Sequence, residues 1–379
     1  MFESAGACAL GGAVCFRRSG WRTLHRRAVR GETPQGRGSC DRGACFPRHA
    51  DRMPNDISLA QARDLLHSRA ELLDRDVRAR RLRRDADGEW VRVHRGTYAA
   101  RESLIDLRPA SLHLLEALAV IARMRGGDAV LSHLSAAVIH GLPQYRFGRS
   151  PVELTVPEGS RAPSRGRVRR HQDELNDSDV VEIDGIRCTS LERTVFDVAR
   201  TRSMEVALSC ADAALRREAG RGHGVDSATQ DAWRDRMRER AAKAAGRRGV
   251  TGARWLIEFA DGRAELPGES VSRLQLFRLG FRDLDLQVPV AGPAGHDYFV
   301  DIALRDCRTF WEFDGEAKYR DPALRGDATI ERILLDEKRR EDWIRGTTQW
   351  RVCRGGFRDI ASPEDLGARL AAFGVTPRS

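Results

Sequence analysis

Lysine is almost missing from this chain. Only three of its 379 residues are lysines, against 62 arginines, a bias typical of a GC-rich genome. Lys318 and Lys338 both fall in the last third of the chain. Lysine carries a compact point charge, unlike the planar guanidinium of arginine, so a lysine kept in such a background is a candidate for a specific role. The alternative is that both are ordinary surface residues.

Long apolar runs are also missing. No stretch of about 18 apolar residues occurs, so we expect neither a membrane-spanning helix nor a membrane partner. Four of the eight cysteines lie in residues 1–52, at spacings too irregular to favour a zinc site. The other four are scattered singly, which is typical of small buried residues in a reducing cytosol. These observations predict a cytoplasmic protein.

The net charge of +10 favours a polyanionic partner, and nucleic acid is the obvious candidate. Residues 1–52 contribute +6 of this charge, from ten arginines and four acidic residues, and leave +4 for the rest. They show no sustained apolar periodicity. Two interpretations stay open: residues 1–52 are a disordered basic tail, or the natural start is Met53 and the preceding residues are a misassigned reading.

Residues 53–105 have the pattern of two helices followed by a two-stranded wing. Ser58 can cap a first helix, and a second, Arg-rich helix is predicted from Leu73 to Arg84. Residues 89–98 then alternate like a pair of strands. This stretch resembles the N-terminal winged helix-turn-helix of the AbiEi family of type IV antitoxins. The alternative is a solvated Arg-rich face. The candidate DNA-binding residues are Arg75, Arg78, Arg80, Arg81, Arg84, Arg92 and Arg95.

Residues 106–218 have a mixed α/β pattern, including a predicted hairpin around Asp184-Gly185. This central domain also resembles the region that follows the winged helix in AbiEi-type antitoxins. Its His133 and His140 lie seven residues apart, and we favour packed histidines over metal ligands or catalysts. Residues 219–262 are rich in charge and alanine, and predict a partly helical connector.

Residues 263–379 contain the strongest chemical signal. Two apolar strands, around Asp301 and Glu312, are predicted to pair as a hairpin. Because strand side chains alternate, Glu312 and Asp314 should share one face, and Asp301 can meet Glu312 across the ladder. Two carboxylates on neighbouring strands suit a hard divalent cation such as Mg²⁺, or Mn²⁺. The alternative is a solvated hairpin face with one polar side.

These residues resemble the PD-(D/E)XK nuclease superfamily, in particular the branch of the very-short-patch-repair endonucleases. The pattern of that branch, a helical Glu, a strand Asp and then Glu-x-Asp-Gly, matches Glu269, Asp301, Glu312 and Asp314. A helix around residues 336–342 and a strand at 350–354 follow, as in the family. Asp314 replaces the Lys of the standard motif. Lys318 stands where relatives with this Asp often have a His.

The predicted fold is therefore multidomain α/β, with a winged helix-turn-helix, a central α/β domain and a restriction-endonuclease-like α/β domain. The resemblance implies magnesium-dependent phosphodiester hydrolysis, in which Asp301 and Glu312 bind the metal. Glu269 would bind a second metal or position water, Lys318 would neutralise phosphate charge, and Asp314 would add a ligand or orient Lys318.

Both resemblances imply DNA as the partner and a setting in phage defence or DNA processing. Two other interpretations stay open. One is a non-catalytic antitoxin-type regulator with a degenerate nuclease fold and a cognate toxin. The other is a protein that binds or cleaves RNA.

Overall fold

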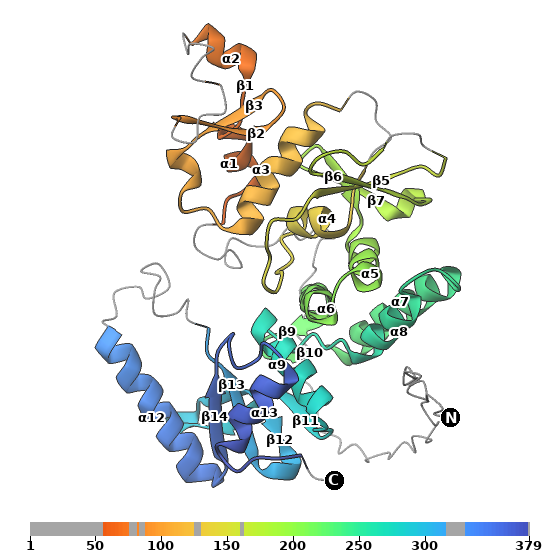
Figure 1. The fold of residues 1–379 in the computed structure, drawn as a ribbon. Coiled ribbons are helices and arrows are strands. Elements are labelled where there is room, and N and C mark those ends of the chain that lie inside the picture. The colour runs from red at the N-terminus through yellow and green to blue at the C-terminus, as the bar shows by residue number, and fades with distance from the viewer. Residues whose placement is uncertain are drawn as a thin grey trace, which may run out of the picture. The chain divides into compact units, whose positions relative to one another are not determined.

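The computed structural model describes residues 56–75, 82, 88–124, 130–159, 163–315 and 330–377. Residues 52–379 form one compact unit, and all the described residues belong to it. The described part of this unit is mixed α/β, with sheets of two, three, four and five strands (Figure 1). The α/β class predicted from the sequence is confirmed at this level.

Two short helices and a small sheet open the described chain. Each helix begins with a capping box, around Ser58 and Ser68, in which the Ser side chain accepts a backbone N–H of the first turn. The first predicted helix is confirmed. A second helix begins at Arg69, where Ser68 caps it, and ends at Asp74, whereas most of the helix predicted from Leu73 to Arg84 lies outside the described residues. The elements are α1 (Leu59–Asp64), β1 (His67–Ser68), α2 (Arg69–Asp74), β2 (Trp90–His94) and β3 (Thr97–Ala100), with the sheet order β1-β3-β2.

A five-stranded sheet of order β6-β5-β4-β8-β7 follows. The predicted hairpin is confirmed: β7 and β8 are joined at Asp184 and Gly185, which both have the positive φ that a tight two-residue turn requires. The elements are α3 (Pro109–Ile121), β4 (Val130–Leu131), α4 (His133–Ile139), β5 (Val152–Val156), β6 (Val168–Gln172), β7 (Val180–Ile183), β8 (Ile186–Thr189) and α5 (Leu191–Thr201).

A helical layer occupies the stretch that the sequence predicted in part as a connector. Its helices share a core with α5, in which Trp233 and Met237 are fully buried. Residues 219–262 therefore contribute buried side chains to this core and do more than connect two domains. The elements are α6 (Met204–Ala219), β9 (Gly220–Arg221), β10 (Gly224–Val225), α7 (Ser227–Lys243) and α8 (Val250–Phe259).

The last sheet has the order β11-β12-β13-β14, antiparallel except for the parallel pair β13–β14. The helix and strand predicted after the hairpin are confirmed as α12 and β14. The elements are α9 (Pro267–Leu279), β11 (Leu284–Ala291), β12 (Asp297–Leu304), β13 (Thr309–Phe313), α12 (Ile330–Thr348), β14 (Arg351–Gly355) and α13 (Pro363–Ala371).

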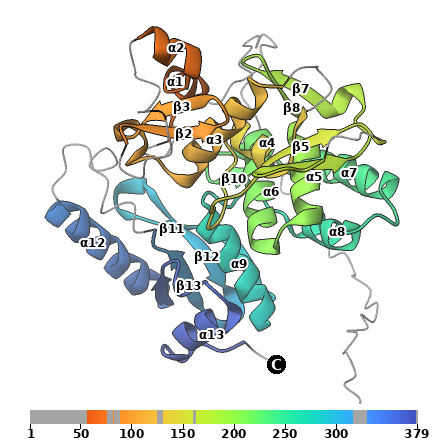
Figure 2. The same cartoon turned by 45° about the horizontal axis from the view of Figure 1, so that its top comes forward.

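Helices cover both faces of this sheet (Figure 2). On one face, Trp311 packs in a core with Val271 of α9 and with residues of α13. On the other face, Phe310 packs in a core with Ile344 of α12.

Short 3-10 helices span Glu102–Leu104, Asp177–Asp179, Pro293–Gly295 and Arg305–Cys307. Within the residues that the structure describes, no helix combines the length and apolar character needed to cross a membrane.

Candidate active site in the C-terminal sheet

The strand register brings the predicted carboxylates near one another. β12 and β13 pair with Ile302 opposite Trp311 and Leu304 opposite Thr309, and Asp301 and Glu312 are the next residues beyond the last pair of this ladder. On the other side of β12, Leu286 pairs with Ile302 and Val288 with Val300, so Gln287 of β11 lies opposite Asp301.

Glu269 reaches this site from the first turn of α9, as the sequence predicted. The preceding Gly268 packs directly on β13, because a Cβ at this position would lie 2.1 Å from Cε1 of Phe313. Glu269 is only 3% exposed. Its Oε2 accepts hydrogen bonds from the backbone N of Glu265 (2.9 Å) and from Nε2 of Gln287 (3.1 Å).

The pKa of Glu269 is raised to about 8, first because burial disfavours the carboxylate and then because Asp301 is negatively charged. Two acidic groups that repel each other in a buried place have the chemistry that a divalent cation would stabilise. The donor set of Glu269 and Asp301 therefore fits such an ion.

Asp301 also holds the next strand. Its Oδ2 accepts a hydrogen bond of 2.8 Å from the backbone N of Phe313. This contact fixes the carboxylate at the point where β12 and β13 stop pairing through their backbones. The structure thus brings Asp301 and Glu269 together, and both are oriented by backbone donors.

Glu312 has different partners. It is 7% exposed, and its two carboxylate oxygens lie 2.6 Å from Nη1 of Arg340 and 2.9 Å from Nη2 of Arg354. Arg354 is in turn held by Glu337 of α12 (2.7 Å). The predicted metal ligand Glu312 therefore forms ion pairs with α12 and β14.

The remaining predicted site residues are placed only in part. Asp314 follows β13, and its backbone N donates to the carbonyl of Gly355 (2.9 Å). Lys318 lies outside the described residues. Within the described part of the chain, no three His, Cys, Asp or Glu side chains are gathered in a group that would hold a metal ion. Magnesium binding stays a prediction.

Sequence reasoning missed Gln287, Arg340 and Arg354. Gln287 had a weak signal, since it is a polar residue within an alternating strand pattern. The two arginines had none, because 62 arginines mask any specific one.

The loop that leads into α9 is tied to the helical layer. Nη2 of Arg216, in α6, lies 2.7 Å from Oε1 of Glu265. The backbone N of Asp261 donates to Oδ1 of Asp212 in α6 (2.8 Å), and Asp212 also pairs with Arg273 of α9 (3.0 Å). The position of Glu269 therefore depends on α6 as well as on its own sheet.

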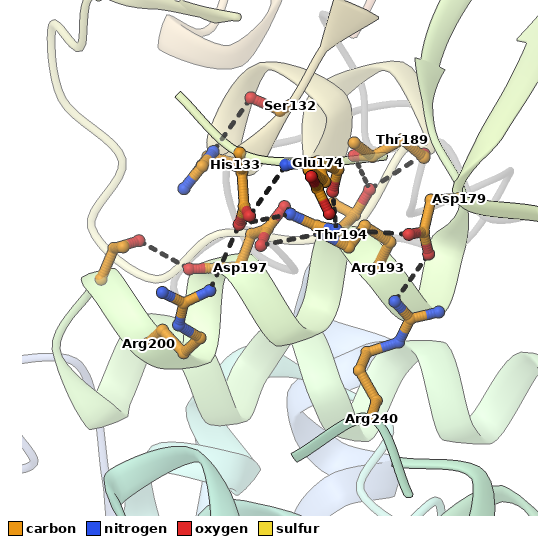
Figure 3. Close-up of polar contacts among 12 residues, drawn as sticks. Ser132, His133, Glu174, Asp179, Thr189, Arg193, Thr194, Asp197, Arg200 and Arg240 are labelled. Carbon is orange, nitrogen blue, oxygen red and sulfur yellow. Dashed lines mark hydrogen bonds and ion pairs between the residues drawn. The ribbon is translucent and has the colours of Figure 1, made fainter. Parts of the chain in front are cut away.

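A second polar centre lies under the five-stranded sheet (Figure 3). Arg193 of α5 is buried and pairs with Asp197 (3.0 Å), Asp173 (2.8 Å) and Asp179 (3.3 Å), and Arg240 of α7 joins Asp179 at 2.6 Å. A cavity of about 360 Å³ adjoins it, with six cationic and five acidic side chains in its lining. Because its charges are so nearly balanced, we assign this centre a structural role that joins α5 to α7.

The two candidate histidines of the central domain are packed residues. His133 is buried and its ring stacks on that of His171, with centroids 3.7 Å apart. Burial lowers the pKa of His133 to about 3. Nε2 of His140 lies 2.7 Å from the carbonyl oxygen of Thr189.

Three of the candidate DNA-binding residues can be placed. Arg75 is the C-cap of α2, and Arg92 and Arg95 are exposed on the β2–β3 hairpin. The other four, Arg78, Arg80, Arg81 and Arg84, lie outside the described residues.

No family model matches this chain. Two curated proteins of Mycobacterium tuberculosis are similar to it: uncharacterized protein Rv2248 (strain ATCC 25618 / H37Rv) and uncharacterized protein MT2308 (strain CDC 1551 / Oshkosh). Each is 30% identical over 267 residues, which cover 67% of this chain and 89% of the relative. The chain belongs to the same family as these mycobacterial proteins.

The raised pKa of Glu269 predicts a pH-dependent stability. The folded protein keeps a proton on Glu269 up to about pH 8, whereas the unfolded chain releases it near the usual value of 4.5. The contribution of Glu269 to the free energy of unfolding is therefore complete below about pH 4.5. It is lost as the pH rises from 4.5 to about 8, at a rate of up to about 1.4 kcal/mol per pH unit. Urea unfolding across this window should show the decline in the wild type. Glu269→Gln should flatten it, and an unaltered pH dependence would contradict the assignment.

Proposed function

We propose that this chain is a DNA-binding protein with a divalent-metal-dependent endonuclease-like domain, active in phage defence or DNA processing. The observation that carries the proposal is the pairing of buried Glu269 with Asp301 at the end of the β12–β13 ladder. A buried carboxyl group next to a second one, on a helix start and a strand, supplies the kind of oxygen ligands that a metal site for phosphodiester hydrolysis would need.

The order of elements supports the resemblance to PD-(D/E)XK nucleases. Residues 263–379 contain, in this order, a helix with Glu269, three antiparallel strands with Asp301 and Glu312, a helix and a parallel strand. On this proposal, the domain is the restriction-endonuclease-like part of the protein.

Each side chain then has a role. Asp301 and Glu269 would hold Mg²⁺ or Mn²⁺, and Glu312 would join them after it releases Arg340. When bound, the ion would polarise the phosphodiester and stabilise the leaving oxygen. Glu269 can keep or release a proton near neutral pH, and Arg340 and Arg354 are guanidinium groups suited to the phosphate oxygens.

The N-terminal elements support the DNA-binding part of the proposal. The order α1, β1, α2 and then a β2–β3 hairpin agrees with a winged helix-turn-helix in residues 53–105. The hairpin would be the wing, and its exposed Arg92 and Arg95 would contact the DNA backbone.

A second candidate function is a non-catalytic regulator of antitoxin type, with DNA and a cognate toxin as partners. The contact of both Glu312 oxygens with arginines favours it, because a salt-bridged carboxylate is already neutralised. The replacement of the motif Lys by Asp314 favours it too.

The deciding experiment is a cleavage assay with plasmid DNA, single-stranded DNA and RNA, with and without Mg²⁺ or Mn²⁺. The enzyme proposal expects cleavage of DNA that depends on the metal. Binding of DNA without cleavage in any metal would establish the regulator instead, and cleavage of RNA alone would redirect the substrate.

We predict that Arg92→Ala with Arg95→Ala weakens DNA binding and reduces its dependence on salt. Each lost phosphate contact should lower the slope of log affinity against log salt by about 0.9. Fluorescence anisotropy over a range of salt concentrations measures it. Arg238→Ala, which removes an exposed arginine of α7, is the matched control. Equal slopes for the double variant and the control would exclude this hairpin as a DNA contact.

A further inference from the structure

Gln287 has an unusual backbone. Its φ is +48°, in the left-handed region that residues with a Cβ rarely adopt. It lies within β11, where a regular strand would keep φ strongly negative. Strained residues of this kind persist only where their surroundings hold them, and they concentrate at functional sites.

The conformation of Gln287 coincides with a change of faces in the sheet. Leu286 and Ile302 pack in the core against α9, whereas their neighbours Val288 and Val300, two residues away, pack in the core against α12. In a regular strand, residues two apart share a face. Both strands therefore switch faces at the level of Gln287 and Asp301.

This switch directs the Gln287 side chain toward the carboxylates. Gln287 is 7% exposed, and its Nε2 donates to Oε2 of Glu269 at 3.1 Å. It lies opposite Asp301 in the register of β11 and β12. Gln287 therefore contacts one of the two proposed ligands and lies opposite the other.

We propose that Gln287 is a positioning residue of this site, which holds the carboxylate of Glu269 beside Asp301 and keeps it available as a ligand. The inference rests on the proposed metal-dependent function for its purpose, but the contact itself can be tested without a metal. Its left-handed backbone is what allows the amide to reach Glu269.

The test replaces Gln287 by glycine in the full chain. Gln287→Gly accepts the positive φ at no steric cost and removes the whole side chain, including the amide that contacts Glu269. We expect the pKa of Glu269, followed by carboxyl ¹³C NMR in the metal-free protein, to rise further. We also expect Mn²⁺ affinity, measured by isothermal titration calorimetry, to fall by about tenfold, the usual effect of losing a group that orients a ligand.

Gln349 supplies a matched control. It also has a positive φ, of 58°, but its Nε2 donates to the carbonyl of Gly346 on the exposed end of α12. Gln349→Gly should leave both the pKa of Glu269 and the Mn²⁺ affinity unchanged. Gln287→Asn tolerates the same φ, and its amide is one methylene too short, so it should behave like Gln287→Gly.

The outcomes separate the two proposals. If the wild type binds no Mn²⁺ but Gln287→Gly raises the pKa of Glu269, the metal proposal fails and the positioning contact stands. If neither the pKa nor the affinity differs from that of Gln349→Gly, the positioning role is wrong, whatever the wild type cleaves.

Discussion

Asp301→Asn should reduce metal-dependent DNA cleavage by orders of magnitude while DNA binding persists. A neutral amide is a poor replacement for a carboxylate ligand, so the effect should fall on the reaction. The amide oxygen can still accept the hydrogen bond from the backbone N of Phe313, so the fold should be retained. Cleavage of labelled duplex and thermal unfolding measure the two effects.

Asp306→Asn is the control for this variant. It makes the same chemical change five residues further on, at an exposed position in the Arg305–Cys307 turn. Its cleavage should equal that of the wild type. If Asp301→Asn cleaves as well as Asp306→Asn, Asp301 is no metal ligand. If neither the wild type nor either variant cleaves DNA, the non-catalytic regulator replaces the enzyme as the proposed function.

The largest effect on stability should come from Arg193→Met. This change leaves the buried Asp197 without its main counter-charge and removes one of the arginine partners of Asp173 and of Asp179. Breaking a buried pair in this way typically costs about 3–5 kcal/mol in the free energy of unfolding. Denaturant unfolding measures the loss.

The loss should also depend on pH. Burial already raises the pKa of Asp197 to about 6, and Arg193 opposes that rise. Without Arg193 the pKa should rise further, so Arg193→Met should be less stable relative to the wild type at high pH than at low pH.

Arg167→Met is the matched control. Arg167 is bidentate to Glu116, but its side chain is 43% exposed. Such surface pairs contribute at most about 1 kcal/mol. Similar losses for the two variants would contradict the structural role of the Arg193 centre.

The local features of the fold could be predicted because they have local causes. The alternation that predicted Glu312 and Asp314 on one face of β13 puts Trp311 and Phe313 on the other, and both aromatic residues lie in the same core. The Asp184-Gly185 turn was predicted because Asp followed by Gly is typical of a two-residue hairpin turn. Helix α2 was not predicted, even though Ser68 and Glu71 form a capping box that is readable in the sequence.

The candidate site was predictable only in part. The proximity of Glu269 and Asp301 was predicted only from their resemblance to a known motif, because no spacing rule places α9 against β12. Arg340 reaches Glu312 through the packing of α12 on the sheet, which depends on tertiary structure. The left-handed backbone of Gln287 could not be predicted, because glycine and asparagine are the residues that normally mark a positive φ.

The polar ties around Asp212 limit how freely this C-terminal region can be moved between proteins. Asp212 belongs to α6, yet it fixes both the loop before α9 and α9 itself. A gene fusion that transferred only residues 263–379 would carry the buried Arg273 without its acidic partner. The structural unit that holds α9 in place therefore includes α6, and the position of Glu269 depends on residues well upstream of its own sheet.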